Sequence, residues 1–397
     1  MERLIGFFSE TFGSSDVWAL TFAYAICIGS LLGFITVYAM FAIWMERKVA
    51  AHIQMRYGPM ETGAFHGWAQ SIADAVKLLF KEDLMPDRGN AFLFWIAPAV
   101  VFCGVFAGTI VLPFAAGMQV ADLHLGVFFI IAIASIEVVG VIMAGWASNS
   151  KYSLFGAVRE AAQVVSYELP SATALLAPIL IVGSFRLGDF NAYQAEHGWL
   201  ILSNPFMPIA ALCFFVSSLA GCKRAPFDLP EAESELVSGF HTEYSGMRFS
   251  FFFLEEYVSM FVVSLLMATL FFGGTTLPFN LFDAGNWSLW AHAEELAHAA
   301  AQPGASAETI AAAEQAQAEA GPLSGIGNII GSHLGIAVLI LKTFFFIFVQ
   351  MWLRWTLPRL RVDQVMTMGY KYLLPWGLVA VFGTTVWETV MSSGAHH

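Results

Sequence analysis

Residues 128–146, FFIIAIASIEVVGVIMAGW, decide the fold of this chain, because they form an almost unbroken apolar run with one acid, Glu137, inside it. A helix of this length crosses a hydrocarbon core of about 30 Å. Similar runs recur along the 397 residues. Hydrophobic residues make up 58% of the chain, against about 45–50% in soluble domains, and the mean hydropathy is +0.67. Because the apolar residues form blocks and not amphipathic stripes, the sequence predicts a polytopic membrane protein.

The apolar blocks predict an all-α fold with eight transmembrane helices. The predicted spans are residues 17–45, 91–114, 125–147, 161–183, 205–221, 249–272, 334–357 and 372–391. The fifth of these is marginal in length for a bilayer. Of the 18 Lys and Arg residues, 15 follow odd-numbered spans. By the positive-inside rule the loops that carry them are cytoplasmic, so both termini are predicted on the outer side.

Three segments outside the spans are predicted to have roles of their own. Residues 63–83 carry apolar side chains at helical spacing and charged ones on another face, which predicts an amphipathic helix at the cytoplasmic interface. Residues 284–332 include a stretch rich in Ala and Glu and are predicted to form a helical insertion on the outer face. Residues 222–248 are predicted to form a cytoplasmic acidic loop.

The acidic loop contains RAPFDLPEAESELVSGFHTEY (224–244), which places five acids in a chain that is only 12% charged. Pro226 and Pro230 prevent a single helix from running through it. Its acids alternate with apolar side chains, so part of the loop is predicted to pack against the membrane domain. The acids then form a proton access path or a sensor of nearby negative charge. A solvated acidic surface is the alternative.

Four carboxylates lie inside the predicted spans at similar depth. Glu137 and Glu168 lie roughly 14 Å and 12 Å from the cytoplasmic ends of their helices. Glu255 and Glu256 lie about 9–10 Å in. A carboxylate that faces lipid costs about 2.5–3.5 kcal/mol, so these groups are predicted to face the interior. Clustered carboxylates share protons, which predicts a proton path, while incidental helix packing is the alternative.

Lys342 lies near the middle of the seventh span. It is predicted to have an anionic partner and to belong to the same path, while a buried structural ion pair is the alternative. The four cysteines show no C-x-x-C spacing, and no pair of histidines occupies a span centre. The sequence therefore predicts no metal site, no disulfide framework and no haem, and we expect this chain to carry no electrons itself.

Five stretches of the sequence resemble one known family. They are ERKVAAHIQMRYGP (46–59), IADAVKLLFKED (72–83), GWASNSKYSLFGAVREAAQVVSYE (145–168), RAPFDLPEAESELVSGFHTEYSGM (224–247) and LPRLRVDQVM (357–366). These segments are similar to the H-type membrane component of bacterial NADH–quinone oxidoreductase, the respiratory complex I. The likeness runs in order from the first span to the last, so it is highly specific.

The resemblance implies an eight-span subunit of the bacterial inner membrane, with both termini periplasmic, between the peripheral redox arm and the membrane arm. It implies that the chain forms the quinone entrance and part of the chamber wall, and that its buried acids couple quinone reduction to proton translocation. The implied quinone-site residues are Arg47, Arg56, Asp228, Glu231 and Glu233. The residues expected on the proton path are Glu137, Glu168, Glu235, Glu256 and Lys342.

The resemblance also implies the partners and cofactors. Quinone is the substrate, this chain binds no cofactor, and FMN and iron–sulfur clusters belong to partner subunits. The expected partners are the quinone-pocket and iron–sulfur subunits of the peripheral arm, the small and antiporter-like membrane subunits, and lipids, with no nucleic acid. In three places the chain departs from the family pattern, and one of these is the outer-face insertion around residues 286–320, which is long for the family. Gly221 stands where many relatives carry an acid, and Glu255 stands where a small residue is usual and is a candidate for the missing carboxylate.

Three other functions remain open at this point. The first is the related membrane subunit of an ion-translocating hydrogenase, against which the intact segments 46–59 and 224–240 argue. The second is a stand-alone proton-coupled transporter, which also uses mid-membrane carboxylates, although the chain shows no internal repeat. The third is an inert membrane anchor, which leaves the buried acids and Lys342 unexplained.

Overall fold

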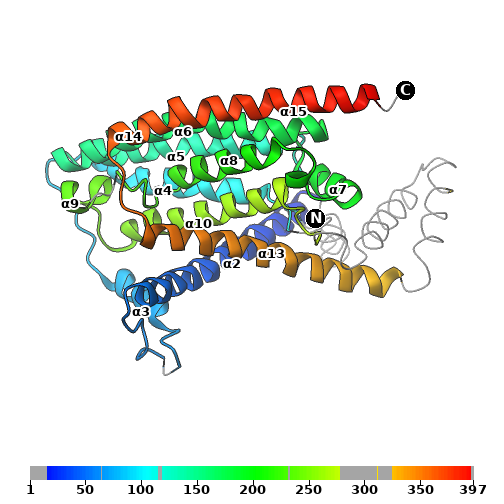
Figure 1. Ribbon diagram of the computed structural model, residues 1–397. Coiled ribbons are helices and arrows are strands. Elements are labelled where there is room, and N and C mark those ends of the chain that lie inside the picture. Colours follow the sequence, from blue (N-terminus) through cyan, green and yellow to red (C-terminus); the bar gives the residue numbers. More distant parts are fainter. Residues whose placement is uncertain are drawn as a thin grey trace.

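Every regular element in the described part of the chain is a helix (Figure 1). The computed structural model describes residues 16–63, 65–114, 119–230, 233–277, 311 and 324–394. The longer helices are α2 (Asp16–Ile53), α3 (Gln70–Phe80), α4 (Ala91–Ile110), α5 (Gly126–Ala147), α6 (Lys151–Val182), α7 (Leu187–His197), α8 (Met207–Gly221), α10 (Gly246–Phe271), α13 (Ser324–Thr356) and α15 (Leu374–Gly394). The short ones are η1 (Leu200–Leu202), α9 (Glu233–Leu236), η2 (Gly239–His241), α14 (Val362–Thr367) and the π-helical η4 (Met368–Leu373).

Seven helical segments of the described chain are long and apolar enough to cross a membrane. They confirm the predicted class, an all-α polytopic membrane protein. The fifth predicted span corresponds to α8, which has 15 residues and is shorter than the 20 or so that a perpendicular crossing needs. The total of eight spans therefore stays a prediction.

Two helices extend well beyond the apolar runs that predicted them. α2 continues to Ile53, where the predicted span stops at residue 45, and α6 begins at Lys151, where it starts at residue 161. The added turn of α6 that holds Gly156 packs closely on the acidic loop, since a Cβ on this glycine would lie 2.7 Å from the backbone nitrogen of Phe240. Hydropathy detects the part of a helix that is apolar because it faces lipid or the protein core. It misses polar extensions of the helix that are covered by other segments of the chain.

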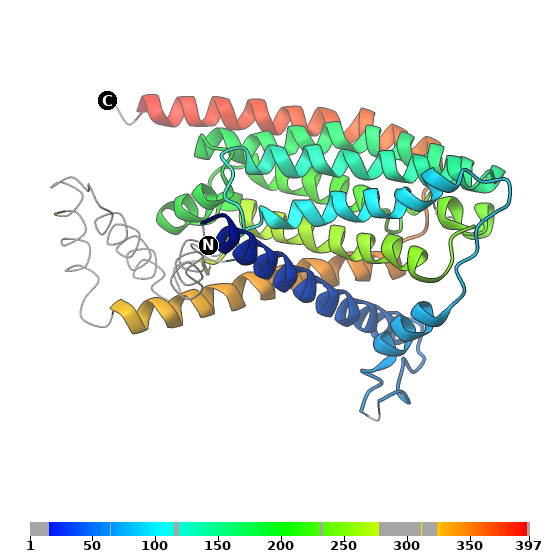
Figure 2. The ribbon, with the colours of Figure 1, turned by 180° about the vertical axis from the view of Figure 1, so that it is seen from behind.

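The described helices form one bundle around α10. α4 packs against α5, α6 packs against α5, α8 and α15, and α10 packs against α4 and α13. Of the most apolar stretch of α10, 78% is buried, the largest share among the described spans. The start of α2 and the end of α15 lie at the end of the bundle where α7 lies, and α9 lies at the opposite end (Figures 1 and 2). α3 projects beyond the bundle beside the other end of α2.

Two of the predicted segments outside the spans differ from the structure or lie outside it. The amphipathic helix expected at 63–83 is helical from Gln70 to Phe80, and the residues just before it form turns. Its position at a membrane interface stays a prediction. The insertion expected at 284–332 lies outside the described residues, apart from residue 311 and the start of α13 at Ser324.

Candidate functional site

A single buried ammonium joins acids from three helices. Lys223 Nζ lies 2.6 Å from Glu137 Oε1 on α5, 3.0 Å from Glu160 Oε1 on α6 and 3.1 Å from Glu255 Oε2 on α10. All four side chains are buried. We call these four residues the Lys223 cluster. Ser259, one turn further along α10, donates a hydrogen bond of 3.0 Å to the other oxygen of Glu255.

Local backbone geometry directs Lys223 into this cluster. α8 ends at Gly221, and Lys223 follows with φ of +55°, in the left-handed region that favours glycine. Burial lowers the pKa of the Lys223 ammonium, but the carboxylates of Glu137, Glu160 and Glu255 outweigh burial and hold this pKa well above its usual range. Lys223 therefore stays positively charged among the three acids.

The next residue, Arg224, belongs to a second buried cluster. Its guanidinium lies 3.2 Å from Glu46 Oε2 on α2 and 3.1 Å from Glu256 Oε2 on α10. Tyr257 donates a hydrogen bond of 2.7 Å to Glu46, and Arg354 of α13 forms an ion pair with the same carboxylate. We call these five residues the Arg224 cluster. It brings together two guanidinium groups and two carboxylates, so its formal charges balance.

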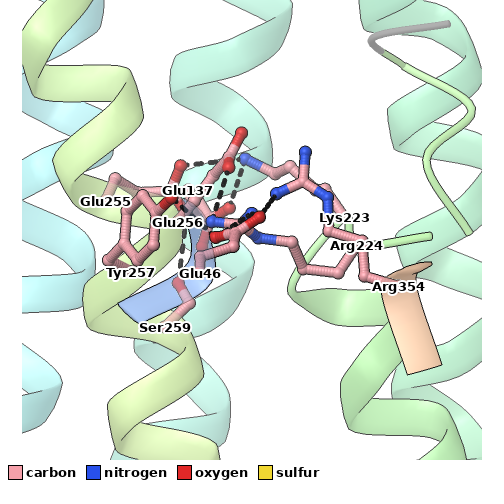
Figure 3. A network of polar contacts seen from close by, with 9 residues as sticks. All are labelled: Glu46, Glu137, Lys223, Arg224, Glu255, Glu256, Tyr257, Ser259 and Arg354. Atoms are coloured by element: carbon pink, nitrogen blue, oxygen red, sulfur yellow. Dashed lines mark hydrogen bonds and ion pairs between the residues drawn. The ribbon is translucent and has the colours of Figure 1, made fainter. Parts of the chain in front are cut away.

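The two clusters meet at the start of the acidic loop. Lys223 and Arg224 reach from one stretch of chain toward glutamates that belong to other helices (Figure 3). The guanidinium carbon of Arg224 also lies 4.5 Å from the centre of the Tyr257 ring. Since two consecutive residues enter two clusters, the chain after α8 cannot move without disturbing the buried charges of both.

Glu168 lies near the Lys223 cluster but outside it. Ser135 of α5 donates a hydrogen bond of 2.8 Å to its Oε1. A cavity of about 140 Å³ lies between α4, α5, α6, α8 and α10, and both Glu168 and Glu137 line it. The hydroxyl-bearing side chains in its wall include those of Ser171, Ser217, Ser218 and Ser259. A water molecule in liquid occupies about 30 Å³, so the cavity has room and polar partners for water between the two acids.

Gly221 also lines this cavity. A Cβ at this position would meet no other atom within 4 Å, and the same is true of Gly108. Position 221, where the resemblance leads us to expect an acid, therefore faces open space among the described residues. Glu255, the candidate for the missing carboxylate, lies in the Lys223 cluster and contacts the ammonium two residues after Gly221.

Two acids of the acidic loop form further ion pairs with neighbouring segments. Asp228 lies 3.0 Å from Arg359, in the segment that joins α13 to α14. Glu235, expected on the proton path, is half exposed and lies 2.6 Å from Arg159, the residue before Glu160 in α6. Glu231 and Glu233 are also expected at the quinone chamber. Glu231 and the side chain of Glu233 lie outside the described residues.

The two arginines expected at the tunnel mouth lie where α2 approaches α3. Arg47 pairs with Asp74 of α3 at 2.6 Å, and both side chains are partly exposed. Arg56 Nε donates a hydrogen bond of 2.8 Å to Gln54. Arg47 therefore links α2 to α3, while Arg56 contacts a residue of its own turn, and these contacts place neither arginine in the two carboxylate clusters.

Lys342 lies far from the carboxylates. Its ammonium donates hydrogen bonds to the carbonyl oxygens of Phe272 at 2.7 Å, of Gly274 at 2.9 Å and of Thr276. Glu255 and Phe272 lie 17 residues apart along α10, which is roughly 25 Å in a helix. Among the described residues, carbonyl groups just after the end of α10 bind Lys342, and its expected anionic partner stays a prediction.

Sequence reasoning missed most of the residues that build the two clusters. The missed members are Glu46, Glu160, Lys223, Arg224, Tyr257 and Arg354. One signal was present, because Glu160 and Glu168 stand eight residues apart and share one side of a helix. That signal needed the true start of α6, which lies ten residues before the predicted one.

The fold and the site together define a polytopic helical membrane protein with charged side chains buried between its spans. Residues 26–385 match the NADH dehydrogenase family, and the chain belongs to this family. It is 43% identical over 361 residues to the H-type chain of NADH-quinone oxidoreductase from Chlorobaculum parvum, covering 90% of each chain. It is 40% identical to the second H-type chain of the same enzyme from Cytophaga hutchinsonii, covering 91% of this chain and 98% of that one. The resemblance found in the sequence is confirmed.

A further relative is a numbered subunit of NADH-quinone oxidoreductase. NADH-quinone oxidoreductase subunit 8 of Rhodothermus marinus is 41% identical to this chain, with 89% of this chain and 94% of the relative covered. The relatives thus share about 90% of the chain, and each is named as a subunit of NADH-quinone oxidoreductase.

Proposed function

We propose that this chain is the membrane subunit of a proton-translocating NADH–quinone oxidoreductase that forms the quinone entrance and part of the chamber wall. Its buried carboxylates couple quinone reduction to proton translocation. The chain acts as part of the complex, in a bacterial inner membrane with both termini periplasmic, while FMN and iron–sulfur clusters are held by partner subunits. The observation that carries the proposal is the meeting of three buried carboxylates at the ammonium of Lys223.

The charge of the Lys223 cluster supports proton binding. Three carboxylates share one ammonium, so full ionisation leaves an excess of negative charge at a buried site. Like charges at short distance in low dielectric favour protonation of one member. The Arg224 cluster, by contrast, has equal numbers of cations and anions, so it carries no excess negative charge. Glu256 therefore supports the path by binding Arg224.

A route for protons follows from the contacts. Glu235 at the surface pairs with Arg159, whose neighbour Glu160 lies in the Lys223 cluster. Glu137 belongs to this cluster and also lines the cavity that Glu168 shares. We therefore propose that protons pass from the acidic loop through the Lys223 cluster and the cavity to Glu168, and from there to the antiporter-like partner subunits.

The corner of α2 and α3 supports the quinone side of the proposal. Large apolar side chains are strongly exposed there, and those of Met55, Tyr57, Phe65 and Phe80 are all at least 75% exposed. Arg47 and Arg56 stand among them. An apolar surface with a few cations suits the isoprenoid tail and the polar head of a quinone that arrives from the bilayer.

Replacing Glu168 with Gln should lower quinone reduction coupled to proton translocation by about tenfold or more, because the amide cannot exchange a proton. The complex should still assemble, since the amide still accepts the hydrogen bond from Ser135. The measurement is NADH-dependent quinone reduction and acidification in sealed membrane vesicles. Glu196→Gln, at an exposed position of α7, is the control. Wild-type coupling in the Glu168 variant would remove this residue from the path.

Replacing Arg47 with Ala should raise the apparent KM for quinone about two- to fivefold, as expected for loss of a partly exposed ion pair. The pair with Asp74 holds α3 beside α2, so its loss loosens the proposed tunnel mouth. Steady-state quinone titration of the complex measures the effect, and Arg88→Ala, at an exposed site, serves as the control. An unchanged KM together with an unchanged maximal rate would place Arg47 outside the tunnel mouth.

A further inference from the structure

Lys223 occupies an unusual place for a buried cation. It belongs to no transmembrane helix but to the first turn of the acidic loop, and its ammonium still contacts acids of α5, α6 and α10. The ammonium also lies 5.4 Å from the centre of the Phe240 ring, which belongs to the far part of the same loop. The loop therefore carries the charge that holds three membrane helices together at this point.

We propose that Lys223 sets the number of protons held by Glu137, Glu160 and Glu255. The inference rests on the proposed function, because it names how the same site is regulated. When the ammonium lies among the acids, it favours their ionised forms and promotes proton release. Without its positive charge, the excess negative charge of the three acids favours proton uptake.

The anchoring of the loop fits this role. The left-handed backbone at Lys223 is a conformation that lysine rarely adopts, so buried contacts must hold it in place. The contacts with Glu137, Glu160 and Glu255 therefore keep the ammonium among the three acids.

Other charged and titratable groups face the Lys223 cluster, and none of them is replaced in the variants compared below. On the loop side, Cys222 and Arg224 flank Lys223. The groups of the adjoining Arg224 cluster are Glu46 on α2, Glu256 and Tyr257 on α10, and Arg354 on α13. Tyr38 of α2 is buried and interacts electrostatically with Arg224 and Glu46.

The test compares variants of Lys223 and Glu160 that either change the net charge of the Lys223 cluster by one unit or leave it unchanged. They are Lys223→Met, Lys223→Arg, Glu160→Gln and the double variant Lys223→Met/Glu160→Gln. Each is made in the whole complex, and proton translocation driven by quinone reduction is followed in vesicles as a function of pH. The readout is the pH at which coupled activity is half lost on the acidic side, where the acids fail to release protons.

Lys223→Met removes one positive charge and should move this half-point to higher pH by about one to three units, the shift that a close opposite charge produces. Glu160→Gln removes one negative charge and should move it to lower pH. The double variant should return toward the wild-type value, and Lys223→Arg should remain near it. Lys151→Met, at an exposed position, should leave the profile unchanged.

A structural role gives a different pattern. The inference is overturned if Lys223→Met and Glu160→Gln move the half-point in the same direction, or if the double variant adds the two losses. Should Lys223→Met not assemble, Glu160→Gln and the double variant still decide the sign. Failure here is distinct from failure of the proposed function, because that function rests on loss of coupling in Glu168→Gln, which can persist whichever way the half-point moves.

Discussion

Replacing Arg224 with Met should prevent the protein from accumulating in stable form, with an expected loss of about 3–5 kcal/mol. The guanidinium binds Glu46 and Glu256, and both carboxylates are buried. Methionine has a similar length but leaves these acids without their shared cation, and breaking a buried ion pair on one side costs far more than an exposed one. The measurements are the amount of this chain in membranes and the temperature at which the complex loses activity.

Arg159→Met is the matched control for this prediction. It also removes an arginine that pairs with a glutamate, but Glu235 is half exposed, so the expected loss is about 0–1 kcal/mol. Equal stability of the Arg224 and Arg159 variants would show that the Arg224 cluster does not hold the bundle together.

Replacing Glu137 with Gln should abolish coupled proton translocation, with a fall of about a hundredfold or more for loss of an acid that transfers protons. Glu137 makes the shortest contact with Lys223 at 2.6 Å, and it is the member of the Lys223 cluster that lines the cavity shared with Glu168. Its loss therefore interrupts both parts of the proposed route. The amide oxygen still accepts a hydrogen bond from Lys223, so the complex should assemble.

This variant is best measured in proteoliposomes that contain the purified complex, as protons moved for each NADH oxidised. Glu196→Gln, an exposed acid of α7, should behave like the wild type. A Glu137 variant that pumps at the wild-type ratio would contradict a path through the Lys223 cluster, even if its overall rate were lower.

The class of fold was predictable because lipid imposes a simple rule on sequence. Apolar runs such as 128–146 correspond to helices, and the buried position of Glu137 follows from the cost of exposing a carboxylate to hydrocarbon. The family was predictable because segments such as 224–247 are long and specific. Both results depend on local sequence alone.

The partners of the acids were not predictable in the same way. Lys223 and Arg224 counted as cytoplasmic surface charges, since the positive-inside rule describes which side a residue is on and not where its side chain points. Their burial depends on the left-handed turn after α8 and on contacts between segments far apart in sequence, such as Glu46 with Arg224. The contacts of Lys342 were not predictable either, because the backbone carbonyl groups that bind it have no sequence signature.

The most direct measurement is the infrared difference spectrum of the intact complex between its states before and after quinone reduction, recorded for the wild type and for Glu137→Gln. Protonated carboxyl groups absorb apart from ionised ones. We predict a carboxyl signal in the wild type that changes with reduction of quinone and is lost or clearly diminished in the variant. An identical signal in both proteins would contradict the central claim, that the acids around Lys223 gain and lose protons as quinone is reduced.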